Sequence, residues 1–76
     1  MPSNLQDIET IEEYTLLFEK YQNFLTQNQK QVFMLYFFEN LSYSEIAEIM
    51  ATSRSAVYDT LKKAMTKLKK ISVNIS

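Results

Sequence analysis

The sequence predicts an all-α fold, a small four-helix domain whose C-terminal part is a helix-turn-helix. Three observations support this prediction. The 76 residues include no glycine and a single proline, Pro2, so tight turns between strands lack their usual residues. Apolar residues recur every three or four positions along most of the chain, which is the helical period. A serine or threonine precedes three of these periodic segments, where its side chain can cap a helix.

Composition predicts one domain, residues 1–76, with one core. Hydrophobic residues make up 46% of the chain, which is too many for a chain that is disordered by composition. The lack of glycine also predicts that the strands of a winged helix-turn-helix are absent. The four helices are expected at residues 5–24, 27–38, 43–50 and 54–71.

Two residue types that are common in catalytic and metal sites are missing from the chain. The chain has no cysteine and no histidine, which excludes zinc fingers, thiol catalysis and a histidine base. We therefore predict a protein that is not an enzyme and that has no cofactor and no metal site. The longest apolar run, residues 32–38, is too short to span a bilayer, so we expect no membrane insertion and a cytoplasmic location.

The charges are divided unevenly along the chain. The net charge is −1, yet residues 1–50 carry two lysines against eight acids, a net of −6. Residues 51–76 carry six basic residues against Asp59, a net of +5. Such a division indicates a surface that meets an anion, and a phosphate backbone is the partner that fits best. The alternative is a solvated helix face.

The first two helices are predicted to supply much of the core. In residues 5–24 one apolar stripe extends to Phe24, and the acids near its start are expected to face solvent. Thr26 and Gln29 have the spacing of a reciprocal capping box, which starts the second helix. Because residues 32–38 are all apolar, we expect this helix to lie at the centre of the domain.

The third helix is predicted from its two ends. Asn40 is the best available residue for a left-handed end to the preceding helix, and Ser42 with Glu45 forms a second capping box. We expect four residues of this helix to face inward, namely Ile46, Ala47, Ile49 and Met50.

The fourth helix separates an apolar face from a polar one. Ser53 is expected to cap it, and Val57, Leu61, Ala64, Met65, Leu68 and Ile71 fall on one side. The opposite side carries Ser55, Asp59, Lys62, Lys63, Thr66, Lys69 and Lys70, with Arg54 and Tyr58 on its flank. A short helix, a tight turn and a longer helix with an exposed basic face are typical of a helix-turn-helix.

Several segments together resemble known families. The segments are Leu25-Thr26 to Gln29, residues 41–50, and Ser53 to Asp59 with Leu61. They are similar to the promoter-reading C-terminal domain of bacterial sigma factors. Leu17-Phe18 to Tyr21, Tyr36 and Ala56-Val57-Tyr58-Asp59 make the YlxM-like family of small helix-turn-helix proteins the closer match, over residues 14–70.

The resemblance implies a DNA-binding regulator, with residues 42–50 as the supporting helix and residues 53–70 as the recognition helix. It also implies a link to the signal recognition particle pathway, because such proteins are typically encoded beside the GTPase of that particle or its receptor. The alternative function is a non-enzymatic interaction module that binds the RNA or the GTPase of the particle. A homodimer is a further arrangement that the resemblance allows.

The predicted nucleic-acid contacts lie on these two helices. Ser53, Arg54 and Ser55 are predicted to contact phosphate or guanine. Tyr58 is predicted to contact a sugar or a thymine methyl group. Tyr43 and Ser44 are predicted to contact flanking phosphates. Lys62, Lys63, Lys67, Lys69 and Lys70 are expected to follow the phosphate backbone. For Tyr43, packing is an equal alternative.

Two residues depart from the sigma-like pattern. Asp59 places an acid on the groove face, where it can accept a hydrogen bond from cytosine, Arg54 or Lys62, or can meet a protein partner. Ala51 replaces the usual glycine of the turn, which would cost on the order of 1 kcal/mol in a left-handed conformation. We therefore expect this turn to be built differently.

Overall fold

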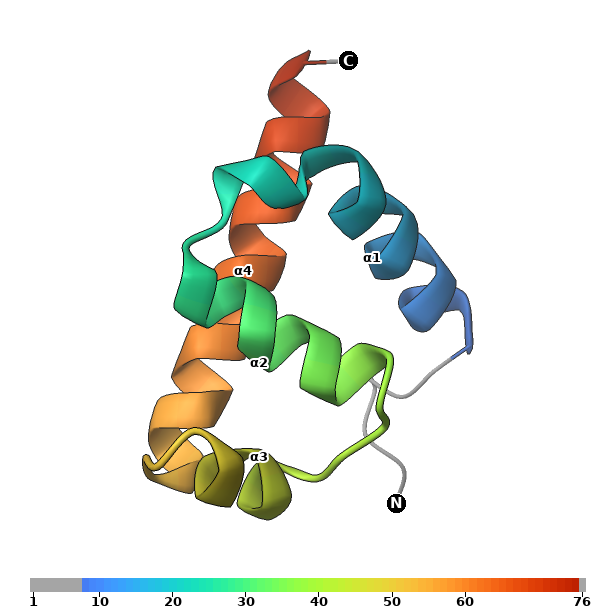
Figure 1. Cartoon of the computed structure of the whole chain (residues 1–76). Coiled ribbons are helices and arrows are strands. Elements are labelled where there is room, and N and C mark those ends of the chain that lie inside the picture. Colours follow the sequence, from blue (N-terminus) through green and yellow to red (C-terminus); the bar gives the residue numbers. More distant parts are fainter. Residues whose placement is uncertain (1–7, 76) are drawn as a thin grey trace.

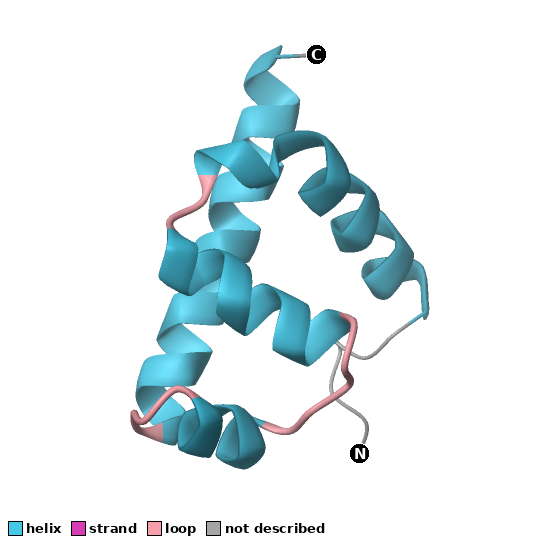
Figure 2. Cartoon of the chain, viewed as in Figure 1, coloured by secondary structure: helices cyan, strands magenta, loops and turns pink. Residues whose placement is uncertain are grey.

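The computed structural model describes residues 8–75, and the regular structure in this range is entirely helical (Figure 1 and Figure 2). The elements are α1 (Ile8–Tyr21), the 3₁₀-helix η2 (Gln22–Phe24), α2 (Gln27–Phe37), α3 (Tyr43–Ile49) and α4 (Arg54–Ile75). No strand occurs in this part of the chain, so the predicted all-α fold is confirmed.

Helix α4 organises the domain. Its 22 residues extend over roughly 33 Å at the usual helical rise, along most of the molecule (Figure 1). Helices α1, α2 and α3 each contact α4 more extensively than they contact one another. The prediction that the second helix would be central is therefore wrong. Helix α2 contacts α4, α3 and, through Phe18, α1, but Met34 and the adjoining Phe38 remain nearly half exposed.

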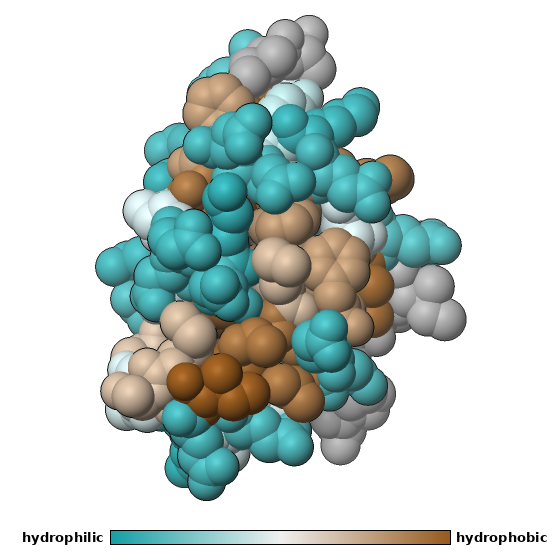
Figure 3. Space-filling view, in the orientation of Figure 1, coloured by the Kyte–Doolittle hydropathy of each residue, from teal (hydrophilic) through white to brown (hydrophobic). Residues whose placement is uncertain are grey.

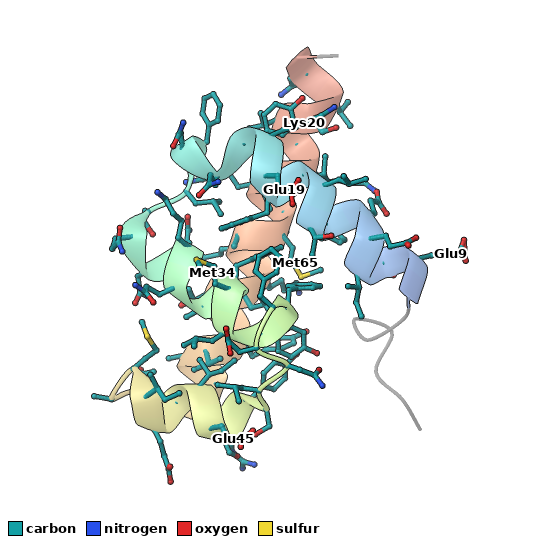
Figure 4. All side chains as sticks on the ribbon, turned by 45° about the vertical axis from the view of Figure 1, so that its right-hand side comes forward. Glu9, Glu19, Lys20, Met34, Glu45 and Met65 are labelled. Carbon is teal, nitrogen blue, oxygen red and sulfur yellow. The ribbon has the colours of Figure 1, made fainter. Side chains whose placement is uncertain are left out.

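The core is built on the predicted apolar face of α4. Val57, Leu61, Ala64 and Leu68 are completely buried, and Met65 faces the other helices (Figure 4). Side chains of the other helices complete the core, namely Phe18 of α1, Val32, Phe33 and Tyr36 of α2, Ile46 and Ala47 of α3, and Leu25 before α2. Each large apolar side chain buried in this way contributes about 1.5–3 kcal/mol.

The first helix ends earlier than predicted. Helix α1 stops at Tyr21 and the tighter turn of η2 follows, while residues 5–7 of the predicted helix lie outside the described residues. The change from α-helical to 3₁₀ geometry turns the apolar stripe away from its direction in α1. Phe24 is consequently 54% exposed, and the next residue, Leu25, is buried in its place.

The predicted capping residues are confirmed. The Gln29 amide donates to Thr26 Oγ1 and the Thr26 amide donates to Gln29 Oε1, both at 3.1 Å. Ser42 and Glu45 form the same reciprocal pair, at 3.2 and 2.9 Å. Each box satisfies two amides that would otherwise lack a partner at a helix start.

Helix α3 buries fewer residues than predicted. Ile46 and Ala47 are buried and Met50 is partly buried, but Ile49 is 58% exposed. At 100° per residue, Ile49 lies roughly 100° from the centre of the face that Ile46, Ala47 and Met50 form, so it falls outside the buried side. Figure 3 shows a patch of hydrophobic residues on the molecular surface in the region of α2 and α3.

The turn between α3 and α4 has the usual left-handed residue, although that residue is alanine. Ala51 has φ 56°, and Asn40, which follows α2, has the predicted positive φ of 59°. The Ala51 amide donates to the Glu48 carbonyl at 3.3 Å, and the Thr52 amide donates to the Ala47 carbonyl at 2.9 Å. These two bonds define a Schellman helix end. The expectation of a differently built turn is therefore wrong.

Replacing Ala51 with glycine is expected to raise the free energy of unfolding by about 0.5–1 kcal/mol. The left-handed conformation costs an L-residue roughly 1–2 kcal/mol, and the greater freedom of glycine in the unfolded chain offsets part of the gain. Urea denaturation followed by circular dichroism measures the change. Ala56→Gly, inside helix α4, is the matched control and should lower the stability by about 1 kcal/mol. Destabilisation by Ala51→Gly would contradict the expectation.

Helix α4 also runs further than predicted. It continues to Ile75, beyond the expected end at residue 71, because residues 72–75 contain no helix breaker. Helices α2 and α3 each end one residue before the predicted position, at Phe37 and Ile49. All seven residues predicted for the polar side of α4 are exposed. This side lies opposite the buried face of α4.

Candidate nucleic-acid interface

The start of α4 presents three polar side chains to solvent. The Ala56 amide donates to Ser53 Oγ at 3.1 Å, so Ser53 caps the helix as predicted. Its hydroxyl also lies 3.4 Å from that of Ser55. Ser53, Arg54 and Ser55 are all exposed. Because the cap occupies the Ser53 oxygen, the guanidinium of Arg54 and the hydroxyl of Ser55 are the groups best placed to contact a ligand.

A shallow hollow of about 490 Å³ brings the two ends of the helix-turn-helix together. It is lined by Ser42, Tyr43 and Ser44 from the start of α3, and by Arg54, Ser55 and Tyr58 from the first turns of α4. Five of the predicted contact residues therefore share one concave surface. Ser42 was not predicted as a contact, and its hydroxyl already accepts the Glu45 amide in the cap.

Tyrosine rings form one wall of this hollow. Tyr43 stacks on Tyr36 of α2, with ring centroids 5.4 Å apart, and Tyr58 meets Tyr43 edge-on at 5.7 Å. Tyr36 is buried and Tyr43 is partly buried, whereas Tyr58 is 46% exposed. Burial, followed by the influence of the neighbouring Tyr36, raises the pKa of Tyr43 to about 12.

The raised pKa of Tyr43 predicts a loss of stability in alkali. Below pH 10, the ordinary tyrosine value, Tyr43 is neutral in both the folded and the unfolded chain. Between about pH 10 and 12 the unfolded chain releases a proton that the folded chain keeps, so the free energy of unfolding falls as pH rises. Urea denaturation across this range should give a shallower fall for Tyr43→Phe than for the unaltered chain. Equal slopes would contradict the shifted pKa.

A second hollow, of about 520 Å³, follows the exposed face of α4. Its lining residues are Gln29, Asp59, Lys62, Lys63, Thr66, Lys67 and Lys70, and we call this surface the lysine groove. Lys67 Nζ donates to Gln29 Oε1 at 3.5 Å, which ties the groove to the start of α2. The predicted residues Asp59, Lys62, Lys63 and Lys67 therefore lie together.

Gln29 and Thr66 were not predicted as groove residues. The sequence placed Thr66 on the same side of the fourth helix as Lys62, but did not predict it as a contact residue. Gln29 could not have been found, because nothing in the sequence places the start of α2 beside α4.

Two charged residues have partners other than those expected. Asp59 Oδ2 lies 3.1 Å from Lys63 Nζ, one helical turn away, so its ion pair is with Lys63 and neither with Arg54 nor with Lys62. Lys69 leaves the row of lysines and pairs with Glu13 of α1, with its ammonium group 5.7 Å from the centre of the Tyr14 ring. The hydrogen bond that Lys69 donates to the Glu13 carboxylate is the largest of the effects that raise the Lys69 pKa. Lys69 thus forms an exposed ion pair between α4 and α1.

Residues 8–75 contain neither a membrane-spanning helix nor a cluster of metal-binding side chains. No helix in that range is long and apolar enough to cross a membrane. No group of three or more Asp or Glu side chains comes together there in a way that could hold a metal ion.

The geometry defines a class of protein. Helix α3, the Schellman turn at Ala51 and helix α4 form a helix-turn-helix, with α4 in the position of the recognition helix. Residues 8–75 match the model of the family described as "UPF0122: Putative helix-turn-helix protein, YlxM / p13 like". The chain belongs to this family, which confirms the YlxM-like resemblance.

Curated relatives carry the same family name. The chain is 43% identical over 54 residues to a UPF0122 protein of Thermoanaerobacter sp. (strain X514), over 71% of this chain and 46% of the relative. It is 45% identical over 56 residues to a UPF0122 protein of Clostridium perfringens (strain SM101), over 74% and 50%. The chain therefore spans about half the length of these relatives. No solved structure matches it.

Proposed function

We propose that this chain is a regulatory protein of the bacterial cytoplasm that binds duplex DNA, with the first two turns of α4 in the major groove. The observation that carries the proposal is the hollow at the start of α4, where Tyr43, Ser44, Arg54, Ser55 and Tyr58 line one surface. In helix-turn-helix proteins the first residues of the recognition helix reach the base edges. The chain would act by binding and not by catalysis.

The side chains in the hollow match what base edges and phosphates offer. The fork of the Arg54 guanidinium suits the two acceptors of guanine, and the Ser55 hydroxyl suits either a base or a phosphate. Ser44, exposed at the start of α3, is placed for a flanking phosphate. Arg54, Tyr58 and Lys62 follow one another at intervals of one helical turn, so they lie on the same face of α4. That face can therefore contact both the bases and the phosphate backbone of DNA.

The lysine groove would hold the phosphate backbone. Lys62, Lys63 and Lys67 point to one hollow, and each lysine that neutralises a phosphate releases bound cations, which makes binding depend on salt. Asp59 lies among them and would repel phosphate, but its ion pair with Lys63 offsets part of that repulsion. A carboxylate can also accept a hydrogen bond from the amino group of cytosine, so Asp59 is a second candidate for base recognition.

Selection from a random duplex pool tests the proposal, with fluorescence anisotropy on the recovered sequences. We expect one enriched motif, and we expect Arg54→Ala to bind that motif about tenfold more weakly, while its affinity for random duplex changes much less. Lys20→Ala, on the exposed side of α1, is the control and should leave both affinities unchanged. Recovery of no motif, or an equal loss on both duplexes in Arg54→Ala, would contradict base recognition by α4.

The runner-up is binding to the RNA or the GTPase of the signal recognition particle. The lysine groove favours it, because most of this surface lies beyond the first turns of α4 and lysines are its most frequent lining residues. Double-stranded RNA is bound mainly through shape and phosphates. Anisotropy with the particle RNA and pull-down with the purified GTPase separate the two functions. Binding to either of them without any enriched duplex would favour the runner-up.

The selection experiment also tests how many copies of this chain bind one DNA site. Two helix-turn-helix units bound side by side recognise half-sites about one helical turn apart. We propose that this chain can bind as a homodimer, and inverted repeats among the recovered duplexes are the expected result. A single unrepeated motif would indicate one copy per site.

A further inference from the structure

A continuous set of aromatic rings joins the core to the surface of the candidate interface. Phe37 and Tyr36 meet edge-on at 5.2 Å, Tyr36 stacks on Tyr43 at 5.4 Å, and Tyr43 meets the edge of Tyr58 at 5.7 Å. The rings come from three helices, α2, α3 and α4. We call Tyr36, Tyr43 and Tyr58 the tyrosine stack.

The tyrosine stack restrains its outermost ring. An exposed tyrosine usually exchanges rotamers freely, and ordering such a side chain on binding costs about 0.5–1.5 kcal/mol. Tyr58 is 46% exposed, yet Tyr43 supports one edge of its ring, and Tyr43 in turn rests on the buried Tyr36. The exposed part of Tyr58 is therefore an apolar surface that is held in place before any ligand arrives.

Polar donors border this apolar surface. Arg54 lies one helical turn before Tyr58, and Ser55 lies on the same lining of the hollow. In the major groove, thymine presents a 5-methyl group beside its O4 acceptor, a combination that no other base of DNA has. Uracil, the corresponding base of RNA, lacks the methyl group. An apolar surface next to a hydrogen-bond donor fits the edge of thymine.

We propose that Tyr58 determines specificity by contacting the 5-methyl group of one thymine, and that Tyr43 is a positioning residue that holds the Tyr58 ring for this contact. The inference rests on the proposed function, since it requires α4 to lie in the major groove. It gives Tyr43 a role through its ring and not through its hydroxyl. Tyr43→Phe should therefore be tolerated, whereas loss of the ring should not.

Replacement of single thymines with deoxyuridine tests the contact directly. In the duplex recovered by selection, each thymine is replaced in turn, which removes one methyl group and leaves every hydrogen-bonding group unchanged. The unaltered chain should bind about fourfold more weakly at one position, the effect of one buried methyl group. The ratio of the two affinities at that position measures the methyl contact separately from overall affinity.

The variants should divide by their effect on this ratio. In Tyr58→Ser and Tyr43→Leu the ratio should fall to about one, while in Tyr58→Phe and Tyr43→Phe it should stay near four. Arg54→Ala should weaken binding to both duplexes and keep the ratio. Phe24→Leu changes an aromatic ring that is 54% exposed on η2, and this control should keep both affinity and ratio.

Each failure has a separate meaning. An enriched motif without deoxyuridine sensitivity at any position would overturn the methyl contact and leave the proposed function standing. A ratio near four in folded Tyr43→Leu would overturn the positioning role of Tyr43. Absence of any enriched motif would overturn both this inference and the proposed function.

A second measurement needs no variant, in case Tyr43→Leu does not fold. Nuclear Overhauser effects between the rings of Tyr43 and Tyr58 should be present in the free chain and should persist in the DNA complex. Their disappearance on binding would overturn the proposal that Tyr43 holds Tyr58 at the base.

Discussion

Replacing Phe33 with alanine is expected to lower the free energy of unfolding by about 3–5 kcal/mol, the usual range for a buried phenylalanine. Phe33 is completely buried, and its ring stacks on Phe18 of α1 at 4.5 Å and on Phe37 at 4.4 Å. Its removal leaves a cavity where α1 and α2 meet above α4. Domains of this size have little stability in reserve, so much of the Phe33→Ala population should be unfolded at 37 °C.

Urea denaturation followed by circular dichroism measures this loss. Phe24→Ala is the matched control, since it removes the same side chain from a position that is 54% exposed. Substitutions at such exposed sites usually change stability by no more than about 0.5 kcal/mol. A loss below about 1.5 kcal/mol in Phe33→Ala would be too small for a filled core position and would contradict the packing described for α1 and α2.

Changing Lys62, Lys63 and Lys67 together to glutamine is expected to weaken binding to duplex DNA by roughly 10- to 100-fold near 0.1 M salt. The three lysines line the lysine groove, and each phosphate contact on duplex DNA contributes about 0.9 to the slope of log affinity against log salt. That slope should therefore become shallower by about 2–3. The change at Lys63 also removes the ion-pair partner of Asp59, which leaves a bare carboxylate facing the phosphates.

Anisotropy titrations over a range of salt concentrations check this expectation. Lys69→Gln on the same helix and Lys20→Gln on α1 serve as controls, because Lys69 pairs with Glu13 and Lys20 lies on another helix. The order of preference among DNA sequences should be the same in the triple variant as in the unaltered chain, since lysine contacts to phosphate do not read bases. An unchanged salt slope would place the phosphates on another surface.

The features that the sequence predicted correctly depend on nearby residues. A capping box involves side chains and amides three residues apart, so Thr26 with Gln29 and Ser42 with Glu45 could be found without a structure. The apolar face of α4 repeats over six turns, which averages out single exceptions. Both features depend on residues within one segment, so they could be predicted without knowing how the helices pack.

The features that were missed depend on how segments meet. Seven apolar residues in a row placed the second helix at the centre, but α4 has the longer apolar face and supports the other three α-helices of residues 8–75. Phe24 is exposed, contrary to the prediction, because α1 ends at Tyr21 and Phe24 lies in the 3₁₀-helix that follows. Ile49 lies outside the face of α3 that packs on the other helices, so its apolar side chain is exposed.

In the candidate site, too, the local features could be predicted and the contacts between helices could not. The resemblance and the helical period brought Arg54, Ser55 and Tyr58 together, because all three lie on the first turns of one helix. The spacing of Asp59 and Lys63 was also sufficient to predict their ion pair, although it was not the pair expected. Contact between Tyr36 and Tyr43 requires the packing of α2 on α3, and neither periodicity nor charge indicates it.

The central position of α4 also has a consequence for the order of folding in the cell. Helices α1, α2 and α3 precede α4 in the chain, so they leave the ribosome first, and at 7 to 14 residues each is marginal as an isolated helix. Without α4 their apolar residues have no common surface to cover. The nascent chain should therefore stay largely unstructured until α4 has emerged, and then acquire its core in one fast, cooperative step, as small helical domains do.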